Sequence, residues 1–452
     1  MTSSDPGSFR DPASRIVYDG VRVLRLLDAR GLKAWQRVSQ TSFFAKAVSE
    51  GRLIETKEVD PPPGAAAALE HPRLPLITYP YEWTFSMLRD AALLQLDLLS
   101  EALTEDITIK DATPFNIQFL RGKPVFIDVG SFEPYRSGEP WLGYRQFTRQ
   151  FLFPLMMRSW VGVPFQPWLR GDPEGPTAAE MRRMLPLTKR LRLSGLTHVV
   201  LQARMEERLS GQAVRENLRQ AGFSKELIFA NVRRLRKLVA GFKWEPNSAV
   251  WTGYEDCTHV GQDRDAKSAF LSEALTRTRP TVVVDLGAND GHFSLLAAHG
   301  GSHAVAVDSD EAVLDRLYRS LEGEEVSLVL TDLTNPSPSQ GWAGRERPGL
   351  FQRARPDLVV AYGLIHHLIY TASVPPSEVV DWLASFGCPV VVEFVAPEDP
   401  MIARLTANKE EDELHSARTE EGFRRAVEGR FTIEAEEALP SGHRRMFSLR
   451  PR

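Results

Sequence analysis

The sequence predicts an α/β protein: a parallel sheet covered by helices on both faces, preceded by an α+β domain and a helical extension. Two observations predict this arrangement. From Thr281 onward, short apolar segments alternate with amphipathic ones, as in a parallel sheet whose strands are joined by helices. Upstream, apolar residues cover nearly every side of the segment 81–103, which indicates a buried helix in a separate packed domain.

Composition limits the function classes. The chain has 452 residues, enough for about two or three domains. Its formal net charge of −4 argues against a surface that neutralises many phosphates, so no nucleic-acid partner is expected. The two cysteines, Cys257 and Cys388, have neither metal-ligand spacing nor the density of a disulfide framework. We therefore expect no metal site and a reducing, cytoplasmic compartment.

Breaks in composition suggest four regions. They are a disordered tail (1–15), an N-terminal α+β domain (16–140), a helical extension and connector (141–249) and the sheet domain (250–452). The tail lacks the charged start and apolar core of a secretory signal. The most apolar helical stretch contains Arg89, Asp90 and Asp97, so it is too polar to cross a membrane and no membrane partner is expected.

The sheet domain has a regular order of expected elements. Strands are expected at 281–286, 303–308, 326–331, 357–361 and 389–395, and helices at 292–299, 310–321, 376–386 and 419–428. A last apolar segment, 444–449, is expected to be a strand that closes the edge of the sheet.

The first of these strands leads into a glycine turn with the sequence Asp285-Leu286-Gly287-Ala288-Asn289-Asp290-Gly291. Glycines allow backbone to approach a ligand closely because they lack Cβ and tolerate positive φ. A dinucleotide fingerprint would need glycine where Asn289 and His292 stand, so a pyrophosphate cradle is disfavoured. The Asp285 carboxylate would repel phosphate and attract a cationic ligand.

Two more acids end the next two strands. Asp308 follows the second strand, where a carboxylate can accept hydrogen bonds from a ribose diol. Asp332, followed by Leu333, ends the third strand, where it can accept a hydrogen bond from an adenine amine. The alternative is that Asp308 and Asp332 only cap the helices that follow them.

Together, these motifs resemble the class I S-adenosylmethionine-dependent methyltransferases over about residues 250–452. The resemblance implies a Rossmann-like sheet with an antiparallel last strand, and S-adenosylmethionine (SAM) as cofactor. It also implies that the loop 285–291 faces the methionine end of SAM, Asp308 the ribose and Asp332 with Leu333 the adenine.

Candidate catalytic residues follow the fourth and fifth strands. His366 and His367 lie in a turn of a kind found in small-molecule methyltransferases, and either can orient or deprotonate an acceptor. The alternative is that one histidine caps the strand and the other packs beneath the cofactor. Glu393 lies inside an apolar strand, so we expect it to bond to a histidine or to bind substrate. The pattern 393–401 is similar to a bacterial branch that includes nodulation-associated methyltransferases.

Aromatic residues near the site are candidate acceptor contacts. Tyr362 follows the fourth strand, while Trp251 and Tyr254 precede the sheet and can fold over the cofactor or the acceptor as a lid. The alternative is that these aromatic side chains only pack at a domain junction.

The N-terminal half carries a second resemblance. Asp111, Asn116 and Asp128 have the spacing of a kinase catalytic aspartate, a metal-binding asparagine and the aspartate of a D-F-G-like turn. Residues 80–135 therefore resemble a small-molecule kinase lobe. Ile109 replaces the usual histidine, and Lys57 is a weak candidate for the strand lysine. We favour an inactive kinase-like scaffold over active phosphotransfer; a coincidental turn pattern is the third interpretation.

These observations predict transfer of a methyl group from SAM to an oxygen, nitrogen or carbon atom of a small metabolite or saccharide-like acceptor. The N-terminal domain would help to dock that acceptor. The alternatives are a bifunctional kinase-methyltransferase and a non-catalytic SAM-binding scaffold. The sequence does not identify the acceptor or the oligomeric state.

Overall fold

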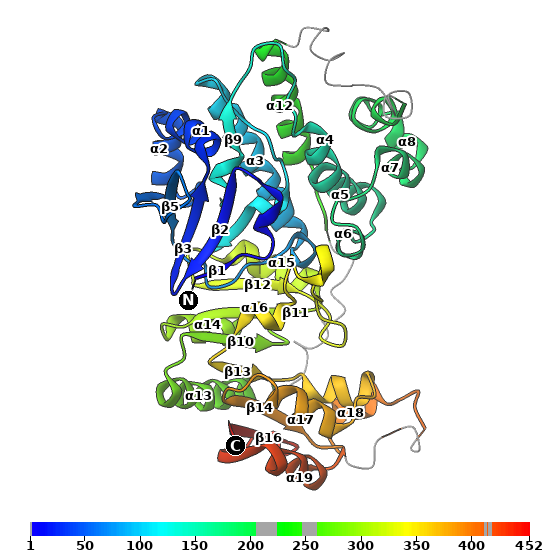
Figure 1. Ribbon diagram of the computed structural model, residues 1–452. Coiled ribbons are helices and arrows are strands. Elements are labelled where there is room, and N and C mark those ends of the chain that lie inside the picture. The colour runs from blue at the N-terminus through cyan, green and yellow to red at the C-terminus, as the bar shows by residue number, and fades with distance from the viewer. Residues whose placement is uncertain (1, 205–223, 246–259, 411–413, 415–417) are drawn as a thin grey trace. The chain divides into compact units, whose positions relative to one another are not determined.

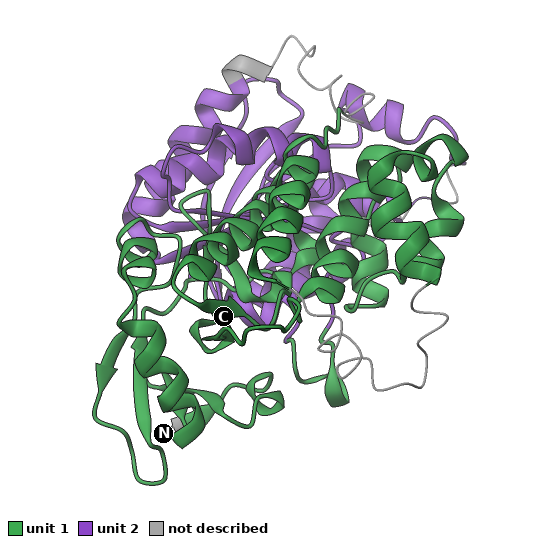
Figure 2. Cartoon of the chain, turned by 90° about the horizontal axis from the view of Figure 1, so that it is seen from above, with its two compact units in different colours: residues 1–245, 339–347 green, residues 246–338, 348–452 purple. Residues whose placement is uncertain are grey.

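The computed structural model describes residues 2–204, 224–245, 260–410, 414 and 418–452. The chain divides into two compact units (Figure 2): unit 1 consists of residues 1–245 and 339–347, and unit 2 of residues 246–338 and 348–452. The segment 339–347, which we expected in the sheet domain, thus groups with unit 1. Its Glu346 forms an ion pair with Arg10, and Gln340 Nε2 donates to the carbonyl oxygen of Arg170 at 2.6 Å.

Unit 1 contains a five-stranded antiparallel sheet with the order β1-β2-β3-β5-β4. Its strands are β1 (Thr2–Ser4), β2 (Ser14–Asp19), β3 (Arg22–Leu27), β4 (Lys57–Val59) and β5 (Ala67–His71). The expected disordered tail at 1–15 is wrong, because β1 pairs with the end of β2. The Asp5 carboxylate anchors it by accepting from the Tyr18 hydroxyl at 2.8 Å and from the Gly7 amide at 2.9 Å.

The predicted buried helix of unit 1 is α3 (Phe85–Thr104), which Thr84 caps through the amide of Met87. Beside it are two hairpins, β6 (Ile107–Ile109) with β9 (Phe132–Pro134) and β7 (Ile117–Leu120) with β8 (Lys123–Phe126). Helices α1 (Ala29–Ser39) and α2 (Ser42–Ser49) join β3 to β4. Short 3-10 turns lie at Ser8–Arg10, Pro80–Glu82, Pro114–Asn116, Val129–Ser131 and Trp342–Gly344.

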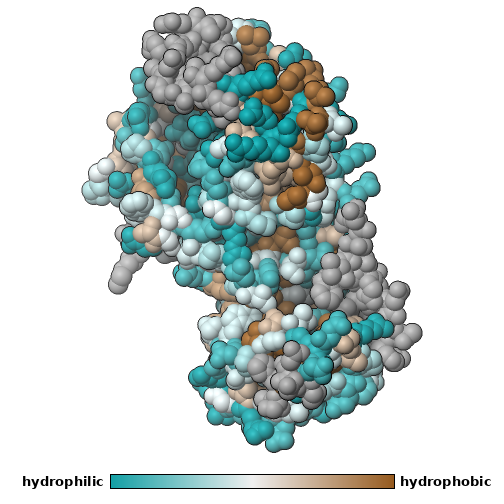
Figure 3. All heavy atoms as spheres, turned by 90° about the vertical axis from the view of Figure 1, so that its right-hand side faces the viewer, coloured by the Kyte–Doolittle hydropathy of each residue, from teal (hydrophilic) through white to brown (hydrophobic). Residues whose placement is uncertain are grey.

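The described residues 141–204 and 224–245 are mostly helical, as predicted. Their helical segments are α4 (Tyr144–Phe147), η5 (Thr148–Leu152), α5 (Phe153–Met156), η6 (Met157–Val161), α6 (Gln166–Gly171), α7 (Ala178–Met184), α8 (Leu187–Arg190), α9 (Leu193–Gly195), η7 (Leu196–Leu201) and α12 (Lys225–Ala240). Leu187, Leu191 and Leu193 are exposed. Figure 3 shows hydrophobic and hydrophilic side chains side by side on the face it presents.

Unit 2 is built on a seven-stranded sheet with the order β12-β11-β10-β13-β14-β16-β15 (Figure 1). Its strands are β10 (Val282–Leu286), β11 (His303–Asp308), β12 (Val326–Leu330), β13 (Leu358–Ala361), β14 (Val390–Val395), β15 (Phe431–Ala438) and β16 (Arg444–Pro451). Strands β10 to β14 are parallel, and β16 is antiparallel to both of its neighbours. Unit 2 therefore has a Rossmann-like methyltransferase fold with the antiparallel final strand that the resemblance implies.

Helices alternate with these strands, as the sequence pattern predicted. They are α13 (Val260–Thr278), α14 (His292–His299), α15 (Glu311–Ser320), α16 (Leu350–Ala354), η10 (His367–Thr371), α17 (Pro376–Ala384), α18 (Pro400–Leu405) and α19 (Glu420–Arg430). The chain moves outward from β10 to β12, then returns to β13 on the other side of β10. Because such crossovers are right-handed, this reversal puts helices on both faces of the sheet.

One predicted position in the sheet is wrong. We expected the segment 444–449 to close the edge, but β16 lies between β14 and β15, and β15 is the edge strand. The sequence of β15, Phe-Thr-Ile-Glu-Ala-Glu-Glu-Ala, has several charged residues and exposes most of its side chains, as an edge strand does. Its apolar residues are too few to give a strong strand signal.

Among the helices of the described residues, none has the length and apolar character needed to cross a membrane.

Candidate functional site

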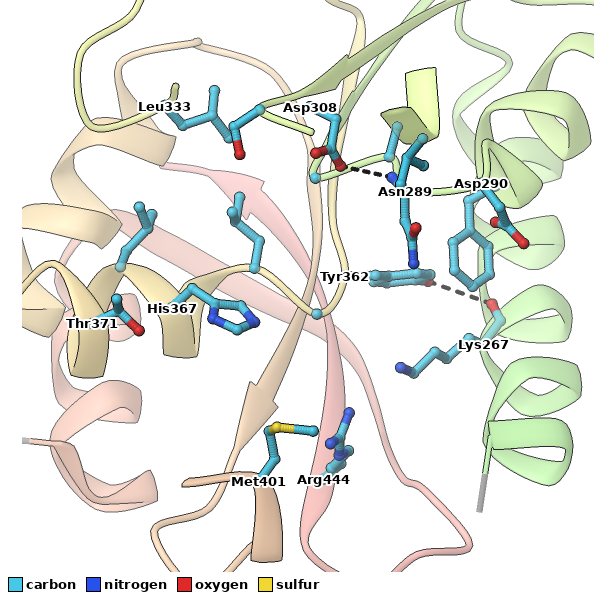
Figure 4. Close-up of a pocket in the computed structure, with 18 of the residues that line it drawn as sticks. Lys267, Asn289, Asp290, Asp308, Leu333, Tyr362, His367, Thr371, Met401 and Arg444 are labelled. Atoms are coloured by element: carbon cyan, nitrogen blue, oxygen red, sulfur yellow. Dashed lines mark hydrogen bonds between the residues drawn. The ribbon is translucent and has the colours of Figure 1, made fainter. Parts of the chain in front are cut away.

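A cavity of about 910 Å³ lies in unit 2 (Figure 4). Its walls come from α13, the loop after β10, the ends of β11 and β12, the turn after β13, α18 and the start of β16. These elements meet at the carboxyl ends of the parallel strands, where the strand order reverses. Open α/β sheets bind their ligands at this position.

The glycine turn contributes its first part to the cavity. Gly287, Ala288 and Asn289 line the wall, and Gly287 and Asn289 have φ values of +79° and +48°. Gly291 is not part of the lining. A Cβ on Gly291 would lie 2.5 Å from Leu317 Cδ2, so this glycine permits close packing between helix α14 and Leu317 of α15.

Asp308 lines the cavity at the end of β11. One of its carboxylate oxygens accepts from the Asn289 amide at 2.8 Å (Figure 4) and the other from the Asp310 amide at 2.9 Å, and the Ser309 amide also bonds to this carboxylate. The side chain that caps α15 is Asp310, which accepts from Ala312 and Val313. Asp308 is therefore not the helix cap that the alternative proposed. Burial raises its pKa, while the backbone amides oppose that rise.

Asp332 and Leu333 line the same cavity beyond β12. The Asp332 carboxylate accepts from the Thr334 amide at 2.8 Å and from the Thr334 hydroxyl at 2.7 Å. These bonds fix the carboxylate in a turn directly after the strand. The structure thus brings the glycine turn and both strand-end acids together around one space.

Asp285 takes a different position from the one we expected. Its side chain is buried, lies outside the cavity lining and accepts from the Ser294 hydroxyl at 2.6 Å. Burial raises the pKa of Asp285 to about 7. The expectation that this carboxylate faces a cationic ligand directly is therefore wrong for this structure, because the carboxyl group turns toward α14.

Glu393 belongs to a buried network of charges. Its carboxylate pairs with Lys267 Nζ at 2.8 Å and with Arg444 Nη1 at 3.2 Å, and it accepts from the Gly363 amide at 2.7 Å. Burial raises its pKa, but Lys267 and Arg444 outweigh this and hold the pKa below its usual value. Glu393 is not part of the cavity lining, and its expected bond to a histidine or to substrate stays a prediction. The Glu393 carboxylate therefore links α13, the turn after β13 and the start of β16.

The two histidines occupy different environments. His367 lines the cavity and points into it (Figure 4), whereas His366 is buried outside the lining. Burial, aided by Arg444, lowers the pKa of His367 to about 4. Burial also lowers the pKa of His366 well below its usual value. Both imidazoles are therefore neutral near pH 7, and only His367 has access to a ligand in the cavity.

Tyr362 is the only one of our three aromatic candidates within the described residues, and it lines the cavity. Its ring meets that of Phe293 edge-on at 4.7 Å, and its hydroxyl donates to the Lys267 carbonyl oxygen at 3.5 Å. Burial raises its pKa well above the usual value, so the hydroxyl stays protonated. Trp251 and Tyr254 lie outside the described residues.

Sequence reasoning missed the charged residues from outside the central strands. Arg264 and Lys267 of α13 line the cavity, and Arg264 pairs with Asp290 of the glycine turn at 2.8 Å. Arg444, at the start of β16, also pairs with Asp399 at 2.8 Å. Arg264 and Lys267 are three residues apart, which places both on one face of α13. This spacing is the sequence feature that could have identified them.

The kinase-like residues of unit 1 also lie close together. Asn116 Nδ2 donates to the Ser131 hydroxyl at 3.1 Å, and that hydroxyl donates to Asp128. Arg25 of β3, which the sequence analysis did not identify, pairs with Asp128 at 2.7 Å. Lys57 instead pairs with Glu55 at 2.9 Å at the surface. The cation paired with Asp128 is therefore Arg25, while Lys57, the weak candidate for the strand lysine, pairs with Glu55.

Burial raises the pKa of Asp111, and the negative charge of Asp128 adds to this effect. Within the described residues, no group of three or more histidine, cysteine, aspartate or glutamate side chains is arranged to hold a metal ion.

No protein-family model matches the chain. It is 33% identical over 456 residues to the nodulation protein NoeA of Rhizobium meliloti (strain 1021), an alignment that covers 98% of this chain and 95% of that protein. The chain belongs to the NoeA family. Both units fall within this alignment, so the similarity to NoeA extends over unit 1 as well as the sheet domain.

This NoeA-family chain is similar to several solved structures at TM-scores below 0.5. They include PH0226 of Pyrococcus horikoshii OT3 (TM-score 0.32, 16% identity, 45% of this chain and 97% of that one). The magnesium protoporphyrin IX methyltransferase ChlM of Synechocystis PCC 6803, with bound SAH, has a TM-score of 0.31 and 14% identity. The match covers 49% of this chain and 94% of ChlM. The N-methyltransferase NodS of Bradyrhizobium japonicum WM9 also has a TM-score of 0.31, with 12% identity. The match covers 42% of this chain and 97% of NodS.

Proposed function

We propose that unit 2 binds SAM and transfers its methyl group to an oxygen, nitrogen or carbon atom of a small metabolite or saccharide-like acceptor. The observation that carries this proposal is that the turn Gly287–Asn289, Asp308 and Asp332 line one cavity at the carboxyl end of the sheet. The strand order supports this proposal, because the chain adds β11 and β12 on one side of β10 and β13 on the other, and ligands bind where the order reverses in this way.

The donor set fits this cofactor. Asp308 lines the cavity with a carboxylate that can accept from a ribose diol, Asp332 with Leu333 stands where the adenine would lie, and the Gly287–Asn289 backbone can approach the methionine end closely. Nearby, Arg264 and Lys267 of α13 line the same wall, where they pair with Asp290 and Glu393. When bound, SAM supplies an electrophilic methyl group on a sulfonium. The chain's own task is then to orient the acceptor and accept its proton.

We assign proton acceptance to His367, the histidine that lines the cavity. It is neutral near pH 7, because its pKa is lowered to about 4, so its imidazole can accept a hydrogen bond from the acceptor and is a weaker base than an ordinary histidine. His366 is buried outside the lining, which favours a packing role for it. Tyr362 keeps its proton and packs on Phe293, so we assign it to shaping the acceptor space.

We infer that unit 1 is an inactive kinase-like scaffold that helps to dock the acceptor. Kinases use the aspartate of the D-F-G-like turn to hold Mg²⁺. The corresponding Asp128 is instead paired with Arg25, whose guanidinium already neutralises it. This ion pair favours a scaffold over active phosphotransfer. The cytoplasm remains the expected location.

The test is cofactor binding followed by product detection. Titration calorimetry with S-adenosylhomocysteine should give saturable binding to the full chain that Asp308→Ala weakens. Incubation of extract with the protein and methyl-labelled SAM should then give a labelled small molecule, detected by mass spectrometry. Saturable binding without any labelled product would favour the non-catalytic scaffold, and absence of binding would contradict the proposal. ATP turnover that Asp128→Ala abolishes would establish the bifunctional alternative.

A further inference from the structure

A second cavity, of about 320 Å³, lies within unit 1 and is separate from the proposed SAM site. It is enclosed by β2, β3, the start of α1, Leu69 of β5, Lys110 and the segment 129–136. Small-molecule sites begin at about this size, so the space suits a ligand smaller than a nucleotide.

Cationic side chains outnumber carboxylates in the lining of this cavity. Four cationic side chains line it, from Arg25, Arg30, Lys110 and Arg136, against the two carboxylates of Asp11 and Glu133. Lys110 pairs with Asp11 at 3.4 Å. Arg30 and Arg136 form no ion pair within the described part of the chain.

Arg25 provides a fixed donor in the wall. Its guanidinium pairs with Asp128 at 2.7 Å, and it donates to Ser14 Oγ at 2.9 Å and to the Ile127 carbonyl oxygen at 3.4 Å. Only 7% of the residue is exposed, and its Nε has no hydrogen-bond partner. A buried donor without a partner costs free energy unless a ligand or water satisfies it.

Gly130 keeps this arrangement open. A Cβ at Gly130 would lie 3.0 Å from Arg25 Nη1 and 3.5 Å from Ser14 Oγ, so a larger residue would press on the guanidinium. Arg30 and Gly31 lie in the first turn of α1, where the Gly31 amide donates to the capping carboxylate of Asp28 at 2.7 Å.

The rest of the wall is apolar. Leu27, Leu69 and Phe132 are buried and line the cavity beside the ring of Trp35. The cavity thus offers an apolar surface next to cationic groups. This combination selects a ligand that has an apolar or ring-shaped body and one anionic group.

We propose that this cavity binds a small organic phosphate, with its phosphate between Arg30, Arg136 and Arg25 and its body against the apolar wall. The site shares no lining residue with the proposed SAM site, so we do not assign its ligand the supply of the methyl group. Neither arginine of the pair Arg30 and Arg136 belongs to the kinase-like motif.

The test uses phenyl phosphate as the probe on the full-length chain, by titration calorimetry at low ionic strength. We expect saturable binding that the double substitution Arg30→Gln with Arg136→Gln weakens about ten-fold or more, since each lost partner is a charge-assisted hydrogen bond. Arg233→Gln is the matched control, because Arg233 is an exposed arginine on α12 away from the cavity lining, and should leave binding unchanged.

A second variant should change the affinity for phenyl phosphate in the opposite direction. Glu133→Gln removes a carboxylate from the wall and should tighten binding of phenyl phosphate several-fold. Phenol should bind more weakly than phenyl phosphate. Equal affinity in the double variant, no saturation at about 10 mM probe, or binding of ATP without binding of phenyl phosphate would each overturn the proposal. Because S-adenosylhomocysteine binding is measured separately, failure here leaves the proposed methyl transfer standing.

Discussion

The Nζ atom of Lys267 lies 2.8 Å from Oε2 of Glu393, and so joins helix α13 to strand β14 through a carboxylate that has no exposed surface. The same carboxylate accepts from the Gly363 amide after β13 and pairs with Arg444 of β16. One buried charge therefore ties together several of the walls around the proposed SAM site. It positions these walls, since it is not itself part of the lining.

Removal of one member of the Lys267–Glu393 ion pair should destabilise unit 2. Lys267→Met should lower the free energy of unfolding by about 3–5 kcal/mol, because it leaves the Glu393 carboxylate buried with one partner fewer. Chemical denaturation of the full chain measures the change. Arg425→Met is the control, because its pair with Glu421 is exposed and should be worth less than about 1 kcal/mol.

The double variant Lys267→Met with Glu393→Gln makes this prediction sharper. Because the two substitutions remove the same interaction, their combined cost should be smaller than the sum of the single costs. Additive costs would show that the pair contributes no coupling.

Asp308 and Asp285 should differ in their effect on the cofactor. Asp308→Asn should weaken binding of S-adenosylhomocysteine about 10- to 100-fold, because it removes a charged acceptor in the cavity wall. Asp285→Asn should change affinity less than about three-fold, since this carboxyl is bonded to Ser294 outside the lining. Titration calorimetry measures both, and a larger loss in Asp285→Asn would contradict the assignment.

Asp285 should also make stability depend on pH. Its folded-state pKa of about 7 lies above the usual value of 3.8, so the folded state binds more protons than the unfolded state between these values. Stability should therefore fall as the pH rises from about 4 to about 7. Asp285→Asn should flatten this fall, whereas Glu421→Gln, at an exposed position, should not. Thermal unfolding across this range measures the slope.

His367 should affect turnover and not cofactor affinity. His367→Ala should lower the rate of methyl transfer about 100-fold, the lower range for general-base catalysis, with cofactor affinity within about three-fold. Since the pKa of His367 is about 4, the wild-type rate should fall only as the pH approaches that value and not near pH 6.5. Full turnover in His367→Ala would exclude His367 as the base.

The methyltransferase-like half was largely predictable because its signals are local. Buried parallel strands are short apolar runs, so the strand at 303–308 matched β11 at both ends. The same holds for the helix at 292–299, which is α14. Edge strand β15 and helix α13 were missed, since their charged faces weaken the periodic pattern.

The site was predictable only in part. Gly287, Asp308 and Asp332 follow the ends of consecutive strands, and parallel strands bring such positions to one edge. The direction in which a side chain turns does not follow from that rule. Asp285 bonds to Ser294 and Glu393 to Lys267, and in each pair the partner comes from another element of the fold.

The sequence by itself determined the strand and helix alternation of unit 2, the glycine turn and the acids at the strand ends, since these depend on periodicity and on residues close in the chain. Only the tertiary structure decided which side chains face the cavity and which charges pair across elements. The Arg25–Asp128 pair spans about 100 positions of sequence, and its energy depends on a distance of 2.7 Å that no local pattern encodes.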